Sequence, residues 1–325
     1  MRTRTAASAL VGLLLVVGAC GSDDAATSSA STTVAASTSP STSPPPSTTA
    51  ATTTTAVPTG PPATTNVLYH EDRFRQIVDV HLPAGEGPHP TILAIHGGAF
   101  STNSKTLYRH FAEYFTTRGV ALVATNYRFV PESTYPAQVE DVQCALAWLH
   151  ANAEGYGFDP ERVVVLGGSA GGYLTAMLGT VEDRDLFAGD CPHPLPEDPV
   201  AGAVVFYGFF DFRTLDDWPF SQVESLQRMW GTTHDQLSSE QLDEMSPIAW
   251  VDGSEPPFLL IHGVEDSTIP SVMSERFHAA LSAAGAPSEL ILIEGTGHAF
   301  ERQPTDSPAN ARSLAAIERF IEGLG

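Results

Sequence analysis

The sequence predicts an α/β fold in which a mostly parallel, twisted sheet carries helices on both faces. One observation supports this prediction. Short apolar runs typical of strands alternate with longer segments of helical period through residues 66–325, and such alternation favours a parallel sheet. One long interval, residues 208–257, breaks the rhythm and is unusually rich in aromatic residues.

Each element can be placed from the same patterns. The expected strands are Arg75 to Leu82, Thr91 to His96, Val120 to Asn126, Arg162 to Leu166, Ala201 to Tyr207, Phe258 to His262 and Glu289 to Glu294. The expected helices are Leu107 to Arg118, Ala137 to Ala153, Ala170 to Thr180, Val272 to Ala284 and Ala309 to Ile321. In the first strand, apolar Val78 and Val80 alternate with polar Asp79 and His81. This alternation predicts an antiparallel or edge strand.

Residues 1–20 have the layout of a secretory signal. Two arginines precede an almost uncharged apolar run from Ala6 to Ala19, which is too short to span a membrane comfortably. The run ends Val17-Gly18-Ala19-Cys20 and resembles the cleavage box of bacterial lipoproteins. The resemblance implies that Cys20 becomes the lipid-modified first residue of a mature chain anchored to the outer face of a bacterial membrane. The alternative is an ordinary secretory signal with an incidental cysteine.

Residues 21–65 consist mainly of Ser, Thr, Ala and Pro. With scarcely an aromatic or large aliphatic side chain, this segment cannot offset the entropy of ordering, so we expect a disordered linker. Residues 66–325 carry nearly all the aromatic and branched aliphatic residues. They are expected to form one domain with a single sizeable core.

The charge balance excludes one class of partner. The chain has 38 acidic and 16 basic residues and a formal net charge of -22, whereas nucleic-acid binding needs clustered Lys and Arg. If Cys20 is lipidated, Cys144 and Cys191 remain, and the sequence leaves open whether they form a disulfide or stay as two thiols. His96 lacks partner ligands at usable spacing, so no metal site is expected. No cofactor is expected either.

The aromatic interval 208–257 reads as a packed insertion. It contains, among other large apolar residues, Phe209, Phe210, Phe212, Trp218, Phe220, Met229 and Trp230. We expect a small lid over a substrate entrance. A helical elaboration that covers a sheet edge is the alternative.

The main chemical signal is Gly167-Gly168-Ser169-Ala170-Gly171-Gly172, which lies directly after an expected strand and directly before an expected helix. In that context the pattern predicts a nucleophile elbow with Ser169 as the nucleophile. Glycines are required because side chains at the neighbouring positions would collide in so tight a turn. The alternative, an anion-binding loop at a helix start, would need no later acid and histidine.

A second loop, His96-Gly97-Gly98-Ala99-Phe100, follows the strand Thr91 to His96. Esterases carry a glycine-rich segment here that donates main-chain N–H groups to the oxyanion, together with the residue after the nucleophile. The predicted donors are Gly98, Ala99 and Ala170. Ala99 replaces the usual third glycine, which leaves the donor pair undecided. His96 is read as structural, tying down the loop by hydrogen bonds.

The acid and the base are expected at the ends of the last two strands. Asp266 lies in the loop after Phe258 to His262, and His298 follows the final strand. The chain order Ser169, Asp266, His298 is that of α/β-hydrolases. A serine hydroxyl needs an imidazole to take its proton and a carboxylate to hold the imidazole, so the three residues are predicted to form a catalytic triad.

These motifs together are similar to those of the hormone-sensitive-lipase-like esterases of the α/β-hydrolase superfamily. The residues that carry the resemblance are His96-Gly97-Gly98, Asn126-Tyr127-Arg128, Tyr135-Pro136-Ala137-Gln138, Glu140-Asp141-Val142, the Ser169 elbow, Ser246-Pro247 and the two late loops. The nearest branch is that of small bacterial carboxylesterases and feruloyl or acetyl-xylan esterases. The resemblance implies the α/β-hydrolase fold, and it implies that Arg128 and Asp141 brace the loop beneath the active site.

The expected activity is hydrolysis of short-chain, aryl or carbohydrate carboxylic esters through an acyl-enzyme. An exported peptidase or amidase of the same fold is one alternative, although such peptidases generally carry a further large domain. A surface binding module on an inactive scaffold is another, since fold does not imply activity. The acyl length, the alcohol partner and the oligomeric state do not follow from the sequence.

Overall fold

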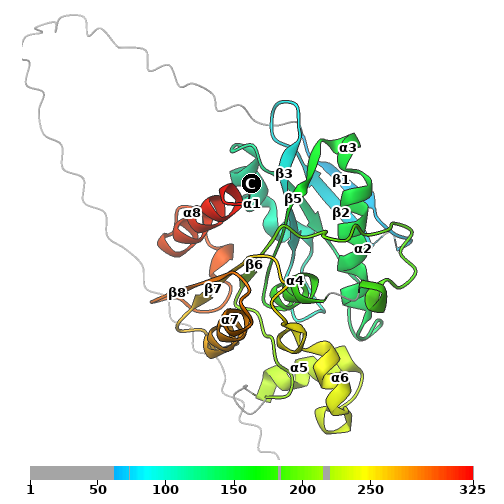
Figure 1. Cartoon of the computed structure of the whole chain (residues 1–325), viewed down its shortest axis with the longest axis vertical. Coiled ribbons are helices and arrows are strands. Elements are labelled where there is room, and N and C mark those ends of the chain that lie inside the picture. The colour runs from blue at the N-terminus through cyan, green and yellow to red at the C-terminus, as the bar shows by residue number, and fades with distance from the viewer. Residues whose placement is uncertain (1–61, 73, 182–183, 215–219, 325) are drawn as a thin grey trace, which may run out of the picture. The chain divides into compact units, whose positions relative to one another are not determined.

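A mostly parallel sheet organises the part of the chain that the structure, a computed structural model, describes: residues 62–324 without 73, 182–183 and 215–219 (Figure 1). The predicted signal, Cys20, most of the predicted linker and Trp218 lie outside these residues. The strands are β1 Thr64–Leu68, β2 Ile77–His81, β3 His89–Ile95, β4 Ala121–Thr125, β5 Phe158–Gly168, β6 Gly202–Phe206, β7 Phe258–Gly263 and β8 Ser288–Ile293. All seven predicted strands are present.

The strand order is β1-β2-β4-β3-β5-β6-β7-β8. β2 runs antiparallel to both of its neighbours, and the pairs from β4 to β8 are parallel. The predicted antiparallel character of β2 is therefore confirmed, but β2 does not form the edge. β1 does, and it begins at Thr64, two residues inside the predicted linker. Its side chains are largely exposed, so β1 is held mainly by its main-chain pairing and carries little apolar signal.

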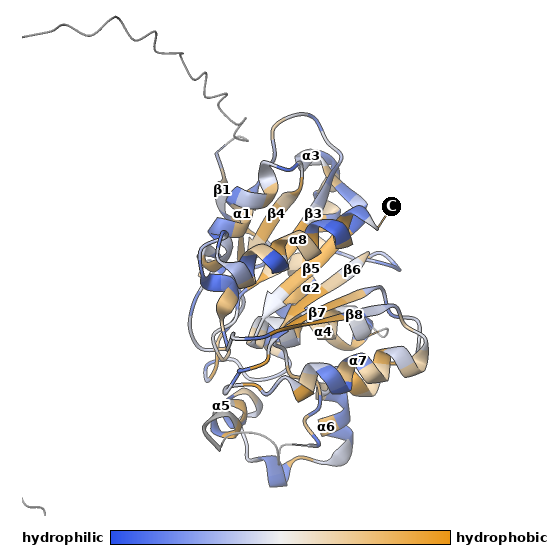
Figure 2. Cartoon of the chain, turned by 90° about the vertical axis from the view of Figure 1, so that its left-hand side faces the viewer, coloured by the Kyte–Doolittle hydropathy of each residue, from blue (hydrophilic) through white to orange (hydrophobic). Residues whose placement is uncertain are grey.

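The helices form two layers. Their bounds are α1 Arg109–Thr116, α2 Ala137–Ala151, α3 Ala153–Tyr156, α4 Ala170–Thr180, α5 Phe220–Trp230, α6 Ser239–Met245, α7 Val272–Ala284 and α8 Pro308–Glu322. Short 3-10 helices are η1 Lys105–Tyr108, η2 Arg184–Phe187, η3 His234–Gln236, η4 Pro247–Trp250 and η5 Phe300–Arg302. α1 and α8 share one apolar cluster with the sheet, and α2, α4 and α7 share the other. The apolar strands between the layers stand out in Figure 2.

β3 illustrates how the two layers arise. Ile92 and Ala94 belong to the cluster with α1 and α8, whereas Leu93 and Ile95 belong to the opposite cluster. All four side chains are fully buried, which is typical of a parallel strand covered on both faces.

No helix in the described part of the chain is long and apolar enough to cross a membrane.

The insertion between β6 and β7 folds into α5 and α6, joined by η3 and followed by η4. Figures 1 and 2 both show α5 and α6 beyond the end of the sheet from which α4 departs, away from α1 and α8. Because α4 follows β5 directly, this is the carboxyl end of the parallel strands, where binding sites of open α/β sheets lie.

Candidate active site

Ser169 sits at the turn between β5 and α4. Its φ of 58° lies in a region that residues with a Cβ rarely adopt, and its N–H donates to the Phe206 carbonyl at 3.1 Å. The turn therefore has the strained conformation predicted for a nucleophile elbow.

Two glycines, Gly171 after the turn and Gly97 in the loop after β3, have no room for a side chain. A Cβ on Gly171 would overlap the Ile95 carbonyl of the neighbouring strand. A Cβ on Gly97 would lie 2.5 Å from the Gly168 carbonyl oxygen and 3.1 Å from the Ser169 Cβ. The absence of side chains lets the loop after β3 lie directly against the nucleophile.

The three predicted triad residues meet at this turn. His298 Nε2 lies 3.1 Å from Ser169 Oγ, and His298 Nδ1 lies 2.7 Å from Asp266 Oδ2. Because the carboxylate oxygen can only accept, Nδ1 carries a proton and Nε2 is free to accept the serine proton. The geometry is that of a proton relay from an alcohol to an imidazole held by a carboxylate.

Asp266 is held in its ionised form. Burial by itself would raise the pKa of this carboxyl, but hydrogen bonds from His262 and His298 outweigh it, and the pKa falls well below its usual range. The other carboxylate oxygen, Oδ1, accepts the main-chain N–H groups of Thr268 and Ile269 at 2.8 and 2.9 Å. The neighbouring Glu265 is exposed, as expected for a solvated residue.

The predicted oxyanion donors lie on both sides of Ser169. Gly98 and Ala99 both have positive φ, 128° and 49°, in the turn after β3, and Ala170 is the first residue of α4. Among the described residues, none accepts a hydrogen bond from the N–H groups of these three residues. They are therefore available to an oxyanion.

Neighbouring segments hold this loop in place. His96 Nδ1 donates to the Gly97 carbonyl at 2.8 Å, and the hydroxyl of Tyr127, whose ring stacks on His96, donates to the His96 carbonyl at 2.8 Å. The Val130 N–H donates to the Phe100 carbonyl at 3.0 Å. Burial lowers the pKa of His96 to about 4, so this histidine is neutral and contributes hydrogen bonds, as predicted.

Arg128 and Asp141 form the brace that the motif resemblance implied. The Arg128 main-chain N–H and Nε donate to Asp141 Oδ2 at 2.7 and 3.0 Å, and Nη2 lies 2.8 Å from Oδ1. The Asp141 side chain is buried, and the Arg128 Nη2 group also contacts Glu140 at 3.0 Å. This pair fixes the segment that contains Tyr127 and Val130, and through it the loop after β3.

Aromatic side chains of the insertion pack onto the same region. Phe209 stacks on Tyr173 of α4 with ring centroids 4.9 Å apart, and Phe100 meets Tyr173 edge to face at 5.8 Å. Phe212 bridges from Tyr173 to Trp230 of α5. The insertion is thus packed, and it touches both the loop after β3 and the helix after Ser169.

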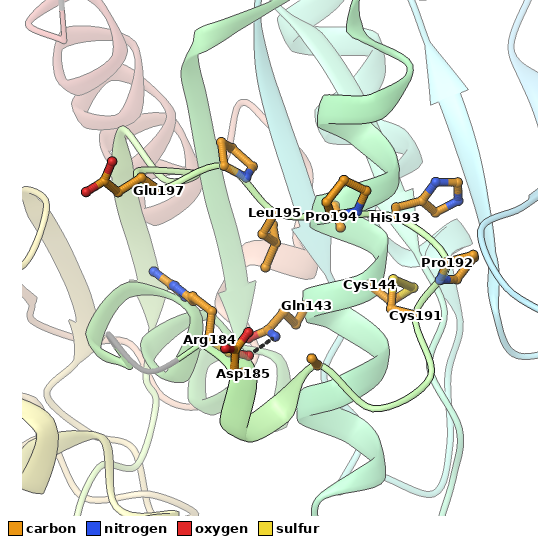
Figure 3. Close-up of a pocket in the computed structure, with 13 residues that line it drawn as sticks. Gln143, Cys144, Arg184, Asp185, Cys191, Pro192, His193, Pro194, Leu195 and Glu197 are labelled. Atoms are coloured by element: carbon orange, nitrogen blue, oxygen red, sulfur yellow. Dashed lines mark hydrogen bonds between the residues drawn. A yellow bond between two sulfur atoms is a disulfide. The ribbon is translucent and has the colours of Figure 1, made fainter.

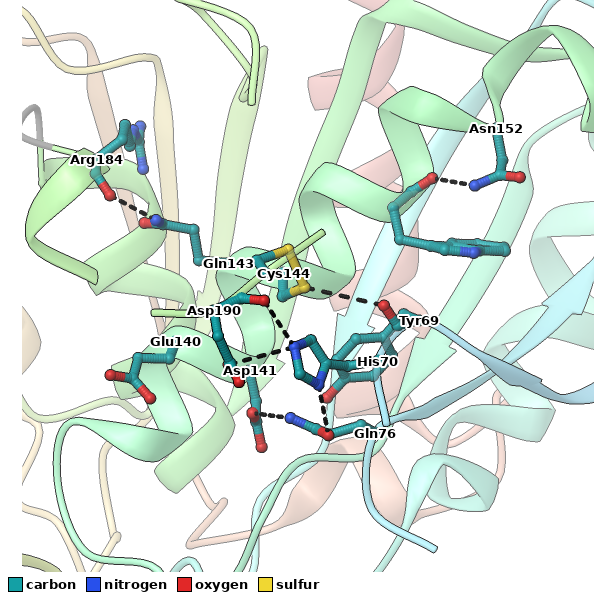
Figure 4. Close-up of a disulfide and its surroundings, with 12 residues drawn as sticks. Tyr69, His70, Gln76, Glu140, Asp141, Gln143, Cys144, Asn152, Arg184 and Asp190 are labelled. Atoms are coloured by element: carbon teal, nitrogen blue, oxygen red, sulfur yellow. Dashed lines mark hydrogen bonds and ion pairs between the residues drawn. A yellow bond between two sulfur atoms is a disulfide. The ribbon is translucent and has the colours of Figure 1, made fainter. Parts of the chain in front are cut away.

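Cys144 and Cys191, whose state the sequence left open, are joined by a disulfide, with their Cα atoms 5.5 Å apart (Figure 4). His70 lies beside the bridge and donates to the Asp190 carbonyl at 3.0 Å. A cavity of about 700 Å³ opens against the disulfide, between α2 and the segment around Pro194 (Figure 3). None of its lining residues belongs to the triad or to the predicted oxyanion donors, so this cavity is separate from the candidate active site.

Two residues at the site, and one that follows it in the chain, were not singled out from the sequence. The Tyr207 ring lies 4.5 Å from the His298 ring, His262 contacts Asp266, and Glu301 is buried three residues after His298. The sequence does hold one signal for His262: it is a histidine in an otherwise apolar strand. Because a buried polar group needs a hydrogen-bond partner, such a residue is expected to contact another polar group. No group of three or more metal-ligating side chains occurs among the described residues.

Comparison with known proteins identifies the family of this chain. The model of the family BD-FAE matches residues 78–281, more than half of the chain. The probable carboxylic ester hydrolase LipM of Mycobacterium tuberculosis is 30% identical over 238 residues, which cover 72% of this chain and 54% of LipM. Esterase LipQ of the same organism is 31% identical, with 73% and 55% covered. The chain therefore spans little more than half the length of these curated relatives.

Solved structures share the fold. A truncated carbohydrate esterase from gut microbiota has a TM-score of 0.71 at 24% identity and covers 82% of this chain and 97% of its own. Esterase Est2 of Thermogutta terrifontis, solved with butyrate, has a TM-score of 0.66 at 26% identity and covers 80% and 93%. The predicted α/β-hydrolase fold and the predicted similarity to esterases are confirmed.

Proposed function

Because the chain belongs to the BD-FAE family, we propose that it hydrolyses carboxylic esters through an acyl-enzyme formed on Ser169. The observation that carries the proposal is the unbroken relay from Ser169 Oγ to His298 Nε2, 3.1 Å, and from His298 Nδ1 to Asp266 Oδ2, 2.7 Å. The esterase names of relatives and structural neighbours support the same chemistry.

Acylation uses each group once. Ser169 Oγ attacks the ester carbonyl carbon while its proton passes to His298 Nε2, and Asp266 stabilises the imidazolium. The carbonyl oxygen becomes an alkoxide that accepts N–H groups of Gly98, Ala99 and Ala170. Each such donor contributes roughly 3 kcal/mol in the transition state. When the tetrahedral species collapses, the proton on Nε2 leaves with the alcohol.

Deacylation repeats the sequence with water. His298 Nε2 takes a proton from water, the hydroxide attacks the acyl carbon, and the same donors hold the second oxyanion. Collapse returns the proton from Nε2 to Ser169 Oγ and releases the carboxylic acid. Both half-reactions need only the groups already at the site.

The proposed substrates are short-chain, aryl or carbohydrate esters. Support comes from the aromatic packing of Phe100, Tyr173 and Phe209 beside the predicted oxyanion donors, because this region is already filled by rings. In this proposal the insertion 208–257 acts as the lid. The enzyme works outside the cell, tethered by a lipid on Cys20, for which the apolar run and the residues before Cys20 give the support.

Labelling with a fluorescent organophosphonate tests the nucleophile. We expect one label per chain, on Ser169, and we expect Ser169→Ala to lower kcat on p-nitrophenyl acetate by on the order of 10⁶-fold. Ser282→Ala, at an exposed serine of α7, serves as the control and should retain full activity. Labelling at another residue would refute the proposal.

Two further measurements separate the alternatives. Faster turnover of a matched p-nitroanilide than of the nitrophenyl ester would identify an amidase, and no turnover of any acyl length would identify an inactive scaffold. Mass spectrometry of the mature N-terminus tests the anchor. Cleavage before Cys20 without a diacylglycerol would leave a secreted enzyme.

A further inference from the structure

His262 lies against Asp266, the acid of the triad, at the same carboxylate oxygen that His298 binds. It is the second-last residue of β7, and its side chain is fully buried. Its Nε2 lies 2.9 Å from the Ile269 carbonyl oxygen and 3.5 Å from Asp266 Oδ2. Its Nδ1 lies 2.7 Å from Ser274 Oγ. Every ring nitrogen therefore has a specific partner.

These partners assign the tautomer. A carbonyl oxygen can only accept, so Nε2 of His262 carries a proton and donates it to the Ile269 carbonyl, with Asp266 Oδ2 3.5 Å from the same nitrogen. In the neutral ring Nδ1 is then an acceptor, and the Ser274 hydroxyl donates to it. Ser274 is itself fully buried on α7.

The two ends of the loop that carries Asp266 meet at this ring. The loop leaves β7 after Gly263, the residue next to His262, and its far end, Ile269, is bound by the His262 side chain. Between these ends the Asp266 N–H donates to the Gly263 carbonyl at 3.2 Å, and the Ile269 N–H donates to Asp266 Oδ1 at 2.9 Å. His262 thus closes the loop that aims the carboxylate at His298.

We propose that His262 is a positioning residue of the relay: held as its Nε2–H tautomer by Ser274, it clamps Ile269 and gives Asp266 Oδ2 a second N–H. The inference rests on the proposed function and adds a fourth member to its triad. Its consequence is that Asp266 keeps one orientation while His298 gains and loses a proton. Without the clamp, the carboxylate turns away for part of the time and stabilises the imidazolium less.

Substitution of His262 tests this role by kinetics. In His262→Leu we expect kcat on p-nitrophenyl acetate to fall by about 10- to 100-fold, by analogy with the loss of hydrogen bonds that orient metal-bound histidines, with KM changed less than about twofold. The acidic limb of kcat/KM, which reports the protonation of His298, should move to lower pH. His262→Gln, which can place an N–H near the position of Nε2, should recover part of the loss. Ser274→Ala, which leaves the ring in place, should give a smaller shift in the same direction.

The chain offers a matched control. His278 on α7 makes the same kind of bond, from Nδ1 to Ser288 Oγ at 2.9 Å, but its only described partner is this serine, which lies on β8. His278→Leu removes a histidine–serine pair without touching the relay, so both kcat and the pH profile should stay at wild-type values. Equal behaviour of His262→Leu and His278→Leu would overturn the proposal, as would a lower kcat in His262→Leu with an unmoved acidic limb.

A readout without substrate distinguishes failure of the clamp from failure of the esterase proposal. The His298 Nδ1 proton, 2.7 Å from the carboxylate as a heavy-atom distance, should give a strongly downfield proton NMR signal in the wild type. We expect the signal to weaken or move upfield in His262→Leu and in Ser274→Ala and to stay in His278→Leu. An unchanged signal in folded His262→Leu would refute the clamp, whatever the enzyme hydrolyses. If the wild-type enzyme hydrolyses no ester, only the proposed function is refuted.

Discussion

The buried carboxyl of Glu301 makes a pH-dependent contribution to stability that one substitution removes. Glu301 lies on η5, only 1% exposed, and its Oε2 has no hydrogen-bond partner among the described residues. Arg302 Nε lies 3.6 Å from the other oxygen. Burial raises the pKa of this carboxyl from its ordinary value of 4.5 to about 7, although the charge of Arg302 opposes the rise.

The direction of the change in stability with pH follows from proton binding. Between pH 4.5 and 7 the folded chain holds a proton on Glu301 that the unfolded chain releases, so the free energy of unfolding falls as the pH rises through this window. Below pH 4.5 both states are protonated and nothing is lost. Above pH 7 both are ionised, and the full loss applies. A pKa rise of this size corresponds to about 3 kcal/mol.

Glu301→Gln keeps the shape and cannot ionise. Urea unfolding at several pH values between 4 and 8.5 should show the variant and the wild type nearly equal at pH 4. At pH 8.5 the variant should be more stable by about 3 kcal/mol. Glu289→Gln, at an exposed position of β8, corrects for the loss of one negative charge from an acidic chain. A stability difference that does not change with pH would refute the reasoning.

Three further predictions concern other sites. Replacing Cys144 and Cys191 together by serine should lower the free energy of unfolding by about 4 kcal/mol, because the bridge spans 47 residues of sequence; reductant should reproduce the loss in the wild type, and urea unfolding measures both. Lys105 Nζ lies 3.0 Å from the buried carboxylate of Asp79. Lys105→Met removes this cation and should lower the free energy of unfolding by about 3–5 kcal/mol in the same assay. Adding Asp79→Leu to this variant should restore part of the stability. Asp266→Asn should lower kcat by about 10⁴-fold with KM little changed, since the amide favours the wrong imidazole tautomer; a loss under tenfold in steady-state assays would contradict the assigned role.

The residues of the relay could be predicted because their signals are local. Ser169, Asp266 and His298 each follow a strand whose apolar run is readable by itself, and parallel strands bring their carboxyl ends to one edge of the sheet. Once the strands are placed, chain order assigns the roles. The flanking glycines add the steric signature of the elbow, and the close contacts of Gly171 bear this out.

The partners of β2 could not be predicted, because they come from elsewhere in the chain. Asp79 alternates with valines, which in isolation is the pattern of a strand with one wet face. In the structure Asp79 is buried, since Lys105 of η1 pairs with it and Asn66 of β1 donates its main-chain N–H to it at 2.9 Å. No sequence spacing links either Lys105 or Asn66 to β2, so these contacts could not be predicted. The contacts of His262 and Glu301 escaped prediction for the same reason.

The backbone itself marks the site. Seven non-glycine residues in the described part of the chain have positive φ. Six of them lie at the elbow, in the loop after β3, directly after β6 or directly after His298: Ala99, Phe100, Asn103, Ser169, Tyr207 and Ala299. Each such residue costs on the order of 1–3 kcal/mol and persists only where its surroundings hold it. The hydrogen bonds to the loop after β3 and the Arg128 brace supply that support here. Conformational cost is therefore concentrated where main-chain N–H groups and one hydroxyl must face a reacting carbonyl. This is the distribution expected if the surrounding structure holds these segments for their chemistry and not for packing.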